Sequence, residues 1–245
     1  MNQAEWIHTA LYAGGFLLLF ASGELLYHAF KVPVEITRKY VHIITGFICL
    51  SFPFVLTSHW SVLILTVSFV FILITSMRLN LLPSINAVKR TTRGSFLFPV
   101  VIYICFWVYS IYGQHNFKGS HLAVENFNRF SLGGTVYYFL PILILSVCDP
   151  LAALVGKKYR LWPYKIFSDT KTIIGSAAFF ISAFILSLIF LIPNCQTFSS
   201  ALGISALIAL STTLAEALSQ KGFDNLFIPV TTAAVLVLFH HYLVL

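Results

Sequence analysis

Residues 149 to 176, DPLAALVGKKYRLWPYKIFSDTKTIIGS, form the longest polar and basic interruption in a chain that is otherwise mostly apolar. The stretch begins with Asp149 at the end of one apolar run, and it ends with KTIIGS at residues 171 to 176, where the next apolar run begins. Gly156 and several cations lie between these ends. This combination of residue types is typical of a site for a charged, phosphate-bearing ligand.

The composition predicts that the rest of the chain lies in a membrane. Hydrophobic residues make up 58% of the sequence and charged residues only 9%, whereas about a quarter of the residues of a soluble domain are charged. A length of 245 residues allows roughly eight helices of about 20 residues. We therefore expect an all-α, polytopic helix bundle that forms a single catalytic domain over residues 1–245.

Eight apolar runs have a length close to that of a membrane-spanning helix. They cover residues 6 to 30, 41 to 57, 60 to 82, 96 to 113, 133 to 148, 172 to 192, 200 to 219 and 225 to 244. The four cysteines are scattered singly in or beside these runs, so neither a zinc site nor a disulfide framework is indicated.

The basic residues predict the orientation of these spans, because short cytoplasmic loops carry an excess of Lys and Arg. If the odd-numbered connections lie on one side, that side has all of the 15 basic residues except Lys118 and Arg129. We therefore expect both termini outside, the 149 to 176 stretch on the cytoplasmic face, and a location in the bacterial cytoplasmic membrane. The net charge of +7 reflects this topology, and no nucleic-acid partner is expected.

Most acidic residues fall on or near the same side, although they contribute little to orientation. For each of them a bland interpretation exists, since a Glu near a helix end can snorkel or pair with a neighbouring Lys. Their convergence on one face favours a function. The six acids in question are Glu24, Glu35, Asp149, Asp169, Glu216 and Asp224.

The central stretch offers the strongest candidates. A carboxylate such as Asp149 at the end of a span is costly unless it binds a cation, and Mg²⁺ bound by one or two carboxylates and ligand phosphates fits this position. Gly156 lets a backbone approach phosphate oxygens, which the adjacent Lys157 neutralises. Lys171, Thr172 and Gly175 bring a cation, a hydroxyl and free N–H groups to the start of the sixth span. No Walker, GxSxG, HExxH or kinase motif is present.

The second span offers a further basic cluster. Arg38 and His42 are spaced i, i+4 and share one helix face, with Lys39 beside them. They can meet an anionic group at the interface, or they can serve only as an orientation anchor. Lys89 and Arg90, in the next cytoplasmic connection, have the same two interpretations.

The seventh connection brings Glu216, Asp224 and Asn225 to the same side. The Asp-Asn pair precedes an apolar run, so it is either a helix N-cap or a set of metal or substrate ligands. Glu216 is the second candidate ligand for the metal.

These residues, in this order, resemble the membrane-embedded CTP-using lipid enzymes. That group comprises phytol, farnesol and dolichol kinases, CTP-dependent diacylglycerol kinases and, more distantly, phosphatidate cytidylyltransferases. The resemblance covers nearly the whole chain. Its motifs in this sequence are RKYVHIITG, KRTTRGSFLFP, DPLAALVGKK with KTIIGS, and DNLFIP. In two places the chain departs from the family pattern: Arg160 stands where a second glycine is frequent, and Ile174 stands where a glutamate is common.

The resemblance implies phosphoryl transfer from a nucleoside triphosphate, CTP, to the hydroxyl of a lipid alcohol. The alcohol would be an isoprenoid such as phytol, farnesol or polyprenol, or diacylglycerol. Asp149 would hold Mg²⁺, and Arg38, Lys39 and His42 would bind the transferring phosphate or the lipid head. Lys171, Lys157 and the two glycines would bind the nucleotide phosphates, with Asp224 as a second metal ligand or base.

Two rival functions remain open. Cytidylyl transfer to a lipid phosphate would use the same triphosphate site, but the chain lacks the acidic, His- and Gly-rich C-terminal signature of that enzyme. A membrane transporter would have a charged or discontinuous path at mid-membrane, whereas the polar groups of this chain gather at one interface.

Overall fold

The computed structural model describes residues 1, 3–79, 81–86, 94–113, 133–166 and 169–243. The chain folds into two compact units. The first comprises Met1–Tyr103 with Lys221–Leu226, and the second comprises Ile104–Gln220 with Phe227–Leu245. The single domain over residues 1–245 stays a prediction, since helices α6 (Gly94–Tyr112) and α11 (Asp224–Leu238) contribute residues to both units.

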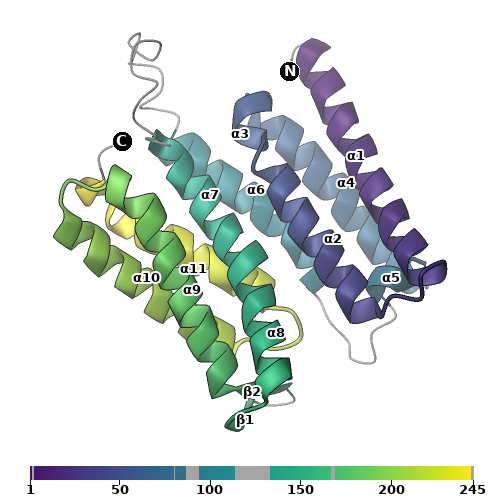
Figure 1. Ribbon diagram of the computed structural model, residues 1–245. Helices are drawn as coiled ribbons and strands as arrows, with labels where there is room; N and C mark the ends of the chain where they lie inside the picture. Colours follow the sequence, from purple (N-terminus) through teal and green to yellow (C-terminus); the bar gives the residue numbers. More distant parts are fainter. Residues whose placement is uncertain (2, 80, 87–93, 114–132, 167–168, 244–245) are drawn as a thin grey trace. The chain divides into compact units, whose positions relative to one another are not determined.

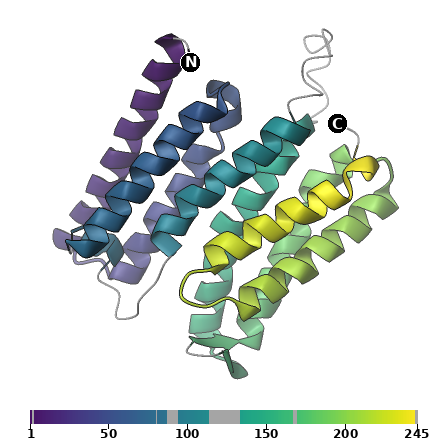
Figure 2. The ribbon, with the colours of Figure 1, turned by 180° about the vertical axis from the view of Figure 1, so that it is seen from behind.

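The first unit is a group of helices packed around α1 (Figures 1 and 2). Its core is aromatic, because Phe16 and Phe20 of α1 contact Phe69 of α4 with ring centroids 5.2 and 5.8 Å apart. The helices of this unit are α1 (Gln3–His28), α2 (Val34–Cys49), α3 (Phe52–Val55), α4 (His59–Arg78) and α5 (Pro83–Asn86), together with the start of α6.

A carboxylate near each end of α1 fixes this helix to its neighbours. Glu5 Oε1 accepts hydrogen bonds from the N–H and the hydroxyl of Thr57, at 2.7 and 2.6 Å, just before α4 begins. Glu24 Oε1 accepts the N–H of Ser84 at 3.0 Å, in the first turn of α5. Glu24 thus has a structural partner on another helix, instead of snorkelling or pairing with Lys31.

The second unit contains the remaining helices and a hairpin. A π-helical segment, Ile144–Cys148, joins α7 and α8 into one continuous helix. The core of the second unit contains the fully buried side chains of Tyr137, Tyr138 and Phe179. The elements are α7 (Val136–Leu143), α8 (Asp149–Tyr159), β1 (Pro163–Ile166), β2 (Asp169–Thr172), α9 (Ile173–Leu191) and α10 (Phe198–Leu218), with short 3-10 segments at Gly133–Thr135, Ile192–Asn194 and His240–Tyr242.

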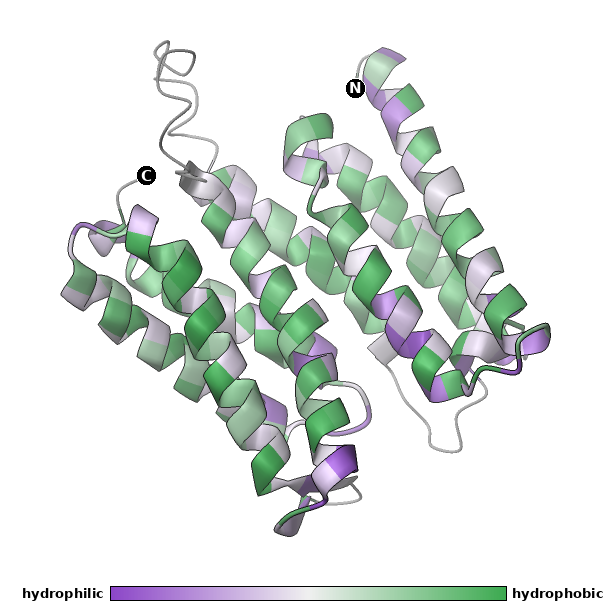
Figure 3. Cartoon of the chain, viewed as in Figure 1, coloured by the Kyte–Doolittle hydropathy of each residue, from purple (hydrophilic) through white to green (hydrophobic). Residues whose placement is uncertain are grey.

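Six helices are long and apolar enough to cross a membrane, which identifies a multi-pass membrane protein. They are Gln3–His28, His59–Arg78, Gly94–Tyr112, Val136–Tyr159, Ile173–Asn194 and Phe198–Leu218. The second predicted span overlaps only the end of α2 and then covers α3, and the eighth extends beyond the end of α11. The helices α2 and α11 have only 16 and 15 residues. A count of eight spans therefore stays a prediction. Figure 3 shows that hydrophobic residues dominate the helices, while the end of α8 and the hairpin are hydrophilic.

The all-α fold class is confirmed, but one local prediction about the central stretch is wrong. The apolar helix does not end at Asp149 but continues to Tyr159. The strands Pro163–Ile166 and Asp169–Thr172 pair in an antiparallel hairpin in which Tyr164 is opposite Lys171 and Pro163 is opposite Thr172. Apart from this hairpin and an isolated bridge between Cys195 and Leu243, the regular structure of the described residues is helical.

Candidate functional site

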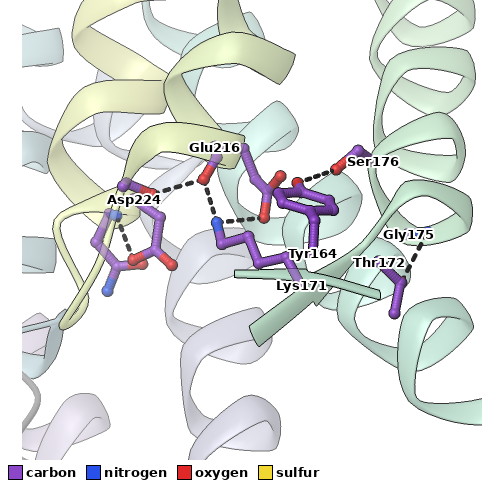
Figure 4. A network of polar contacts seen from close by, with 9 residues as sticks. Tyr164, Lys171, Thr172, Gly175, Ser176, Glu216 and Asp224 are labelled. Atoms are coloured by element: carbon purple, nitrogen blue, oxygen red, sulfur yellow. Dashed lines mark hydrogen bonds and ion pairs between the residues drawn. The ribbon is translucent and has the colours of Figure 1, made fainter. Parts of the chain in front are cut away.

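The hairpin directs the motif residues at the start of α9 toward α8 and α10 (Figure 4). Tyr164 of β1 and Ser176 of α9 share a hydrogen bond of 2.7 Å between their hydroxyl groups. The main-chain N–H of Ile173 donates to the carbonyl of Trp162 at 3.1 Å. These bonds hold the hairpin against the first turn of α9, so the residues at its end, Lys171 and Thr172, have fixed positions.

Thr172, which was predicted to bring a hydroxyl to the start of this helix, is the N-cap of α9. Its hydroxyl accepts the N–H of Gly175 at 3.2 Å. Together with the bond from Ile173 to Trp162, this uses two of the first three helical N–H groups inside the chain. Fewer N–H groups of this helix end therefore remain for an anion than the sequence suggested.

Gly156 and Gly175 lie against each other where α8 crosses the start of α9. A Cβ added at Gly156 would lie 2.7 Å from the Thr172 hydroxyl, and one added at Gly175 would lie 3.0 Å from the carbonyl of Ala152. The two glycines thus allow the helices to approach closely, as small residues do in membrane bundles. Because the other helix fills the space beside them, a direct phosphate contact of either glycine stays a prediction.

Lys171 and Glu216 form an ion pair between β2 and α10. The ammonium Nζ lies 2.6 Å from Oε1 of Glu216 and also donates to the main-chain carbonyl of that residue. The side chains are only 16% and 11% exposed, so water screens the pair weakly. Figure 4 shows the lysine extending from the hairpin to the glutamate. The sequence pattern predicted separate roles for the two residues, phosphate binding for Lys171 and metal binding for Glu216.

This pairing bears on the metal prediction. An ammonium at 2.6 Å from Oε1 repels a divalent cation at the same oxygen, so Glu216 is a poor first ligand for Mg²⁺ while Lys171 is bound to it. Among the described residues there is no group of three or more His, Cys, Asp and Glu side chains able to hold a metal. The role of Asp149 as a Mg²⁺ ligand stays a prediction, and it is chemically compatible with a single carboxylate because phosphates can supply the other ligands.

Asp149 is half-buried and directly follows the π-helical segment Ile144–Cys148. Pro150 explains this segment: it has no N–H for the carbonyl four residues earlier, and its ring would clash with that carbonyl. A wider turn accommodates both effects without ending the helix. The turn places Asp149 inside a continuous helix that ends at Tyr159.

The last turn of α8 brings exposed cations to the polar end of the second unit. Lys157 and Lys158 lie in this turn, where a positive charge also complements the helix dipole. Arg160 follows as the C-cap in the left-handed conformation, with φ of 47°, and is exposed as well. Lys157, Lys158 and Arg160 can neutralise phosphate oxygens, which is the role that the sequence pattern predicts for Lys157.

In the first unit, Arg38, Lys39 and His42 are half-buried side chains of α2. The ring of His42 lies on Phe98 of α6, with centroids 4.4 Å apart. Two motifs that are distant in sequence, RKYVHIITG and GSFLFP, therefore meet at this contact. A role of the three basic residues at a phosphate or a lipid head stays a prediction.

The Asp224-Asn225 pair also joins two motifs. The Asn225 side-chain amide donates to the carbonyl of Gly94 at 2.8 Å, and a Cβ at Gly94 would lie 2.8 Å from that amide nitrogen. Asp224 Oδ1 accepts the N–H of Asn225 at 2.9 Å. Asn225 thus ties the start of α11 to the start of α6, which favours the structural interpretation for this residue. Lys89 and Arg90 lie outside the described residues.

The Lys171–Glu216 pair, the hairpin and the bond between Tyr164 and Ser176 were not predicted. The alternation in PYKI and DTKT, two short segments separated by two residues, is the only strand signal in this stretch. No sequence signal pairs Lys171 with a residue 45 positions away.

The chain is similar to phytol kinase of Synechocystis sp., with 28% identity over 230 residues, which covers 94% of this chain and 90% of the relative. No family model matches the chain. No solved structure matches it either.

Proposed function

We propose that the chain is a membrane-embedded kinase that transfers a phosphoryl group from a nucleoside triphosphate to the hydroxyl of a lipid alcohol. The observation that carries this proposal is the similarity to phytol kinase along 94% of the chain. The proposed acceptor is an isoprenoid alcohol such as phytol, and the proposed donor is CTP, which the motif resemblance favours.

The polar end of the second unit supports this proposal chemically. Phosphoryl transfer is catalysed mainly by positioning and by charge neutralisation, and it requires little covalent chemistry from the protein. Lys157, Lys158 and Arg160 supply positive charge for a triphosphate. Asp149 would hold Mg²⁺, which when bound neutralises phosphate charge. The alkyl part of the alcohol can remain in lipid while its hydroxyl reaches the interface.

The deciding experiment uses the purified full-length protein with Mg²⁺, labelled CTP or ATP, and separate samples of phytol, farnesol, polyprenol and diacylglycerol. We expect a labelled lipid phosphate from an isoprenoid alcohol, formed faster with CTP than with ATP. The absence of any phosphorylated lipid from all of these combinations would refute the kinase assignment.

The same assay tests the metal ligand. In Asp149→Asn the side chain keeps its size but loses its charge, so we expect kcat to fall about 100-fold, the scale seen when one electrostatic contact to the transition state is removed. Raising the Mg²⁺ concentration should restore part of the lost activity. Glu24→Gln is a matched control, because Glu24 bonds Ser84 in the first unit and its amide can still accept that bond. Turnover in Asp149→Asn equal to that of this control would exclude the role.

A further inference from the structure

One carboxylate oxygen in the second unit is buried without a hydrogen bond from any described residue. Glu216 is 8% exposed, and Lys171 binds its Oε1 at 2.6 Å, while Oε2 is fully buried and unsatisfied within the described part of the chain. A buried carboxylate oxygen that lacks a donor loses its hydration without compensation, so such an atom in a folded protein calls for an explanation. A hydrogen-bond donor from a ligand would supply the missing bond.

We propose that Glu216 is the general base of the reaction and that Oε2 receives the hydroxyl of the lipid alcohol. This inference rests on the proposed kinase function. As the alcohol oxygen forms its bond to the γ-phosphorus, its proton passes to Glu216 Oε2. The bond from the γ-phosphorus to the β,γ-bridging oxygen breaks, and the nucleoside diphosphate leaves with that electron pair.

Lys171 gives the base a link to the nucleotide. In the structure its ammonium neutralises Glu216 through Oε1 and the main-chain carbonyl. A triphosphate carries more negative charge than a single carboxylate, so it attracts the ammonium away from Glu216. The carboxylate then loses its cation and becomes a better proton acceptor. Binding of the nucleotide thereby prepares the base for the alcohol.

The ion pair also separates this role from metal binding. A Mg²⁺ ligand would be needed to bind the metal–nucleotide complex, so its loss would weaken nucleotide binding. A base that forms an ion pair with Lys171 competes with the nucleotide phosphates for the Lys171 ammonium. Its loss would leave nucleotide binding unchanged or make it tighter, while transfer to the alcohol becomes slow.

The test compares wild-type protein, Glu216→Gln, Glu216→Asp and the control Glu24→Gln, all full-length and in the same lipid nanodiscs. Three quantities are measured: kcat for phytol phosphate formation, the Kd of Mg–CTP without alcohol, and the Tm. For Glu216→Gln we expect kcat to fall about 10²- to 10⁴-fold, the range for loss of a general base, with a Kd equal to or below that of the wild type. Glu216→Asp keeps a carboxylate and should recover part of kcat.

Three results would overturn the inference. A kcat of Glu216→Gln within about threefold of the wild type would exclude a base, and a Kd for Mg–CTP that rises in step with the loss of kcat would indicate a metal or phosphate ligand. A Glu216→Asp variant that keeps the wild-type Tm but is as inactive as Glu216→Gln would also exclude a general base at this position.

If Glu216→Gln does not fold, the kcat and Kd of Glu216→Asp alone decide the question. A wild-type protein that phosphorylates no alcohol refutes the proposed function and this inference with it, whereas an active wild type confines failure to the inference.

Discussion

Arg160 departs from the motif of the enzymes that the sequence resembles, and it has a left-handed backbone conformation. It ends α8 in the left-handed conformation, with φ of 47°, and its N–H donates to the carbonyl of Gly156 at 3.1 Å. This is the helix C-cap geometry that glycine adopts without a clash of its Cβ. The lipid enzymes that the sequence resembles frequently have glycine at this position, and the structure gives it a conformation that glycine prefers.

We therefore expect Arg160→Gly to raise the free energy of unfolding by about 1 kcal/mol, since a left-handed non-glycine residue costs roughly that amount. Arg160→Ala is the matched variant, because it loses the same charge but keeps a Cβ. Denaturant titrations in mixed micelles would measure both. An alanine variant stabilised as much as the glycine variant would show that the charge, and not the backbone, is responsible.

At the scale of elements, the contact between α8 and α9 depends on the absence of a side chain at Gly156. A methyl group there would approach the Thr172 hydroxyl to 2.7 Å, so Gly156→Ala must displace the cap of α9. We expect a loss of about 1–3 kcal/mol of stability, the usual cost of overpacking.

A double-mutant cycle tests whether that cost arises at the Thr172 hydroxyl. Thr172→Ala alone should cost about 1 kcal/mol through loss of the N-cap. In its background, Gly156→Ala should cost clearly less than in the wild type, because the clashing oxygen is gone. Additive free energies would mean that the added methyl group clashes with another part of the chain.

Sequence patterns predicted the elements of this region only in part. The start of α9 was predicted, because a long apolar run that begins at residue 172 is a local signal. The end of α8 was not, because Asp149-Pro150 resembles a helix boundary, and only the surrounding packing selects a π-helical turn instead. For Gly156 the sequence shows that no side chain is needed, but not whether a phosphate or another helix fills the space.

For the whole molecule, apolar length predicted six helices that are long and apolar enough to cross a membrane, since each backbone polar group in lipid must be satisfied within its own helix. Contacts such as Lys171 with Glu216 and Gly94 with Asn225 could not be predicted, because they depend on which helices pack together and at what height. Charge counting predicts sidedness, which remains to be measured.

The orientation of the chain can be tested at Cys195, which lies in the connection between α9 and α10 that is expected outside. Burial raises the pKa of the Cys195 thiol to about 11, so the thiol stays largely protonated at neutral pH. Because the thiolate reacts with maleimides, its labelling rate should rise about 100-fold between pH 7 and pH 9, well below that pKa. The other three cysteines are buried, and Cys195→Ser should abolish labelling of the folded protein.

In intact cells we expect a membrane-impermeant maleimide to label Cys195. A cysteine introduced by Lys158→Cys in the Cys195→Ser background, at the exposed end of α8, should react only after the cells are permeabilised. Lys158 lies in the last turn of α8 and Cys195 directly follows the span Ile173–Asn194, so this one crossing separates them if the topology is correct. Labelling of Cys195 only after permeabilisation, with Lys158→Cys labelled in intact cells, would invert the predicted orientation and place the proposed kinase site outside the cytoplasm.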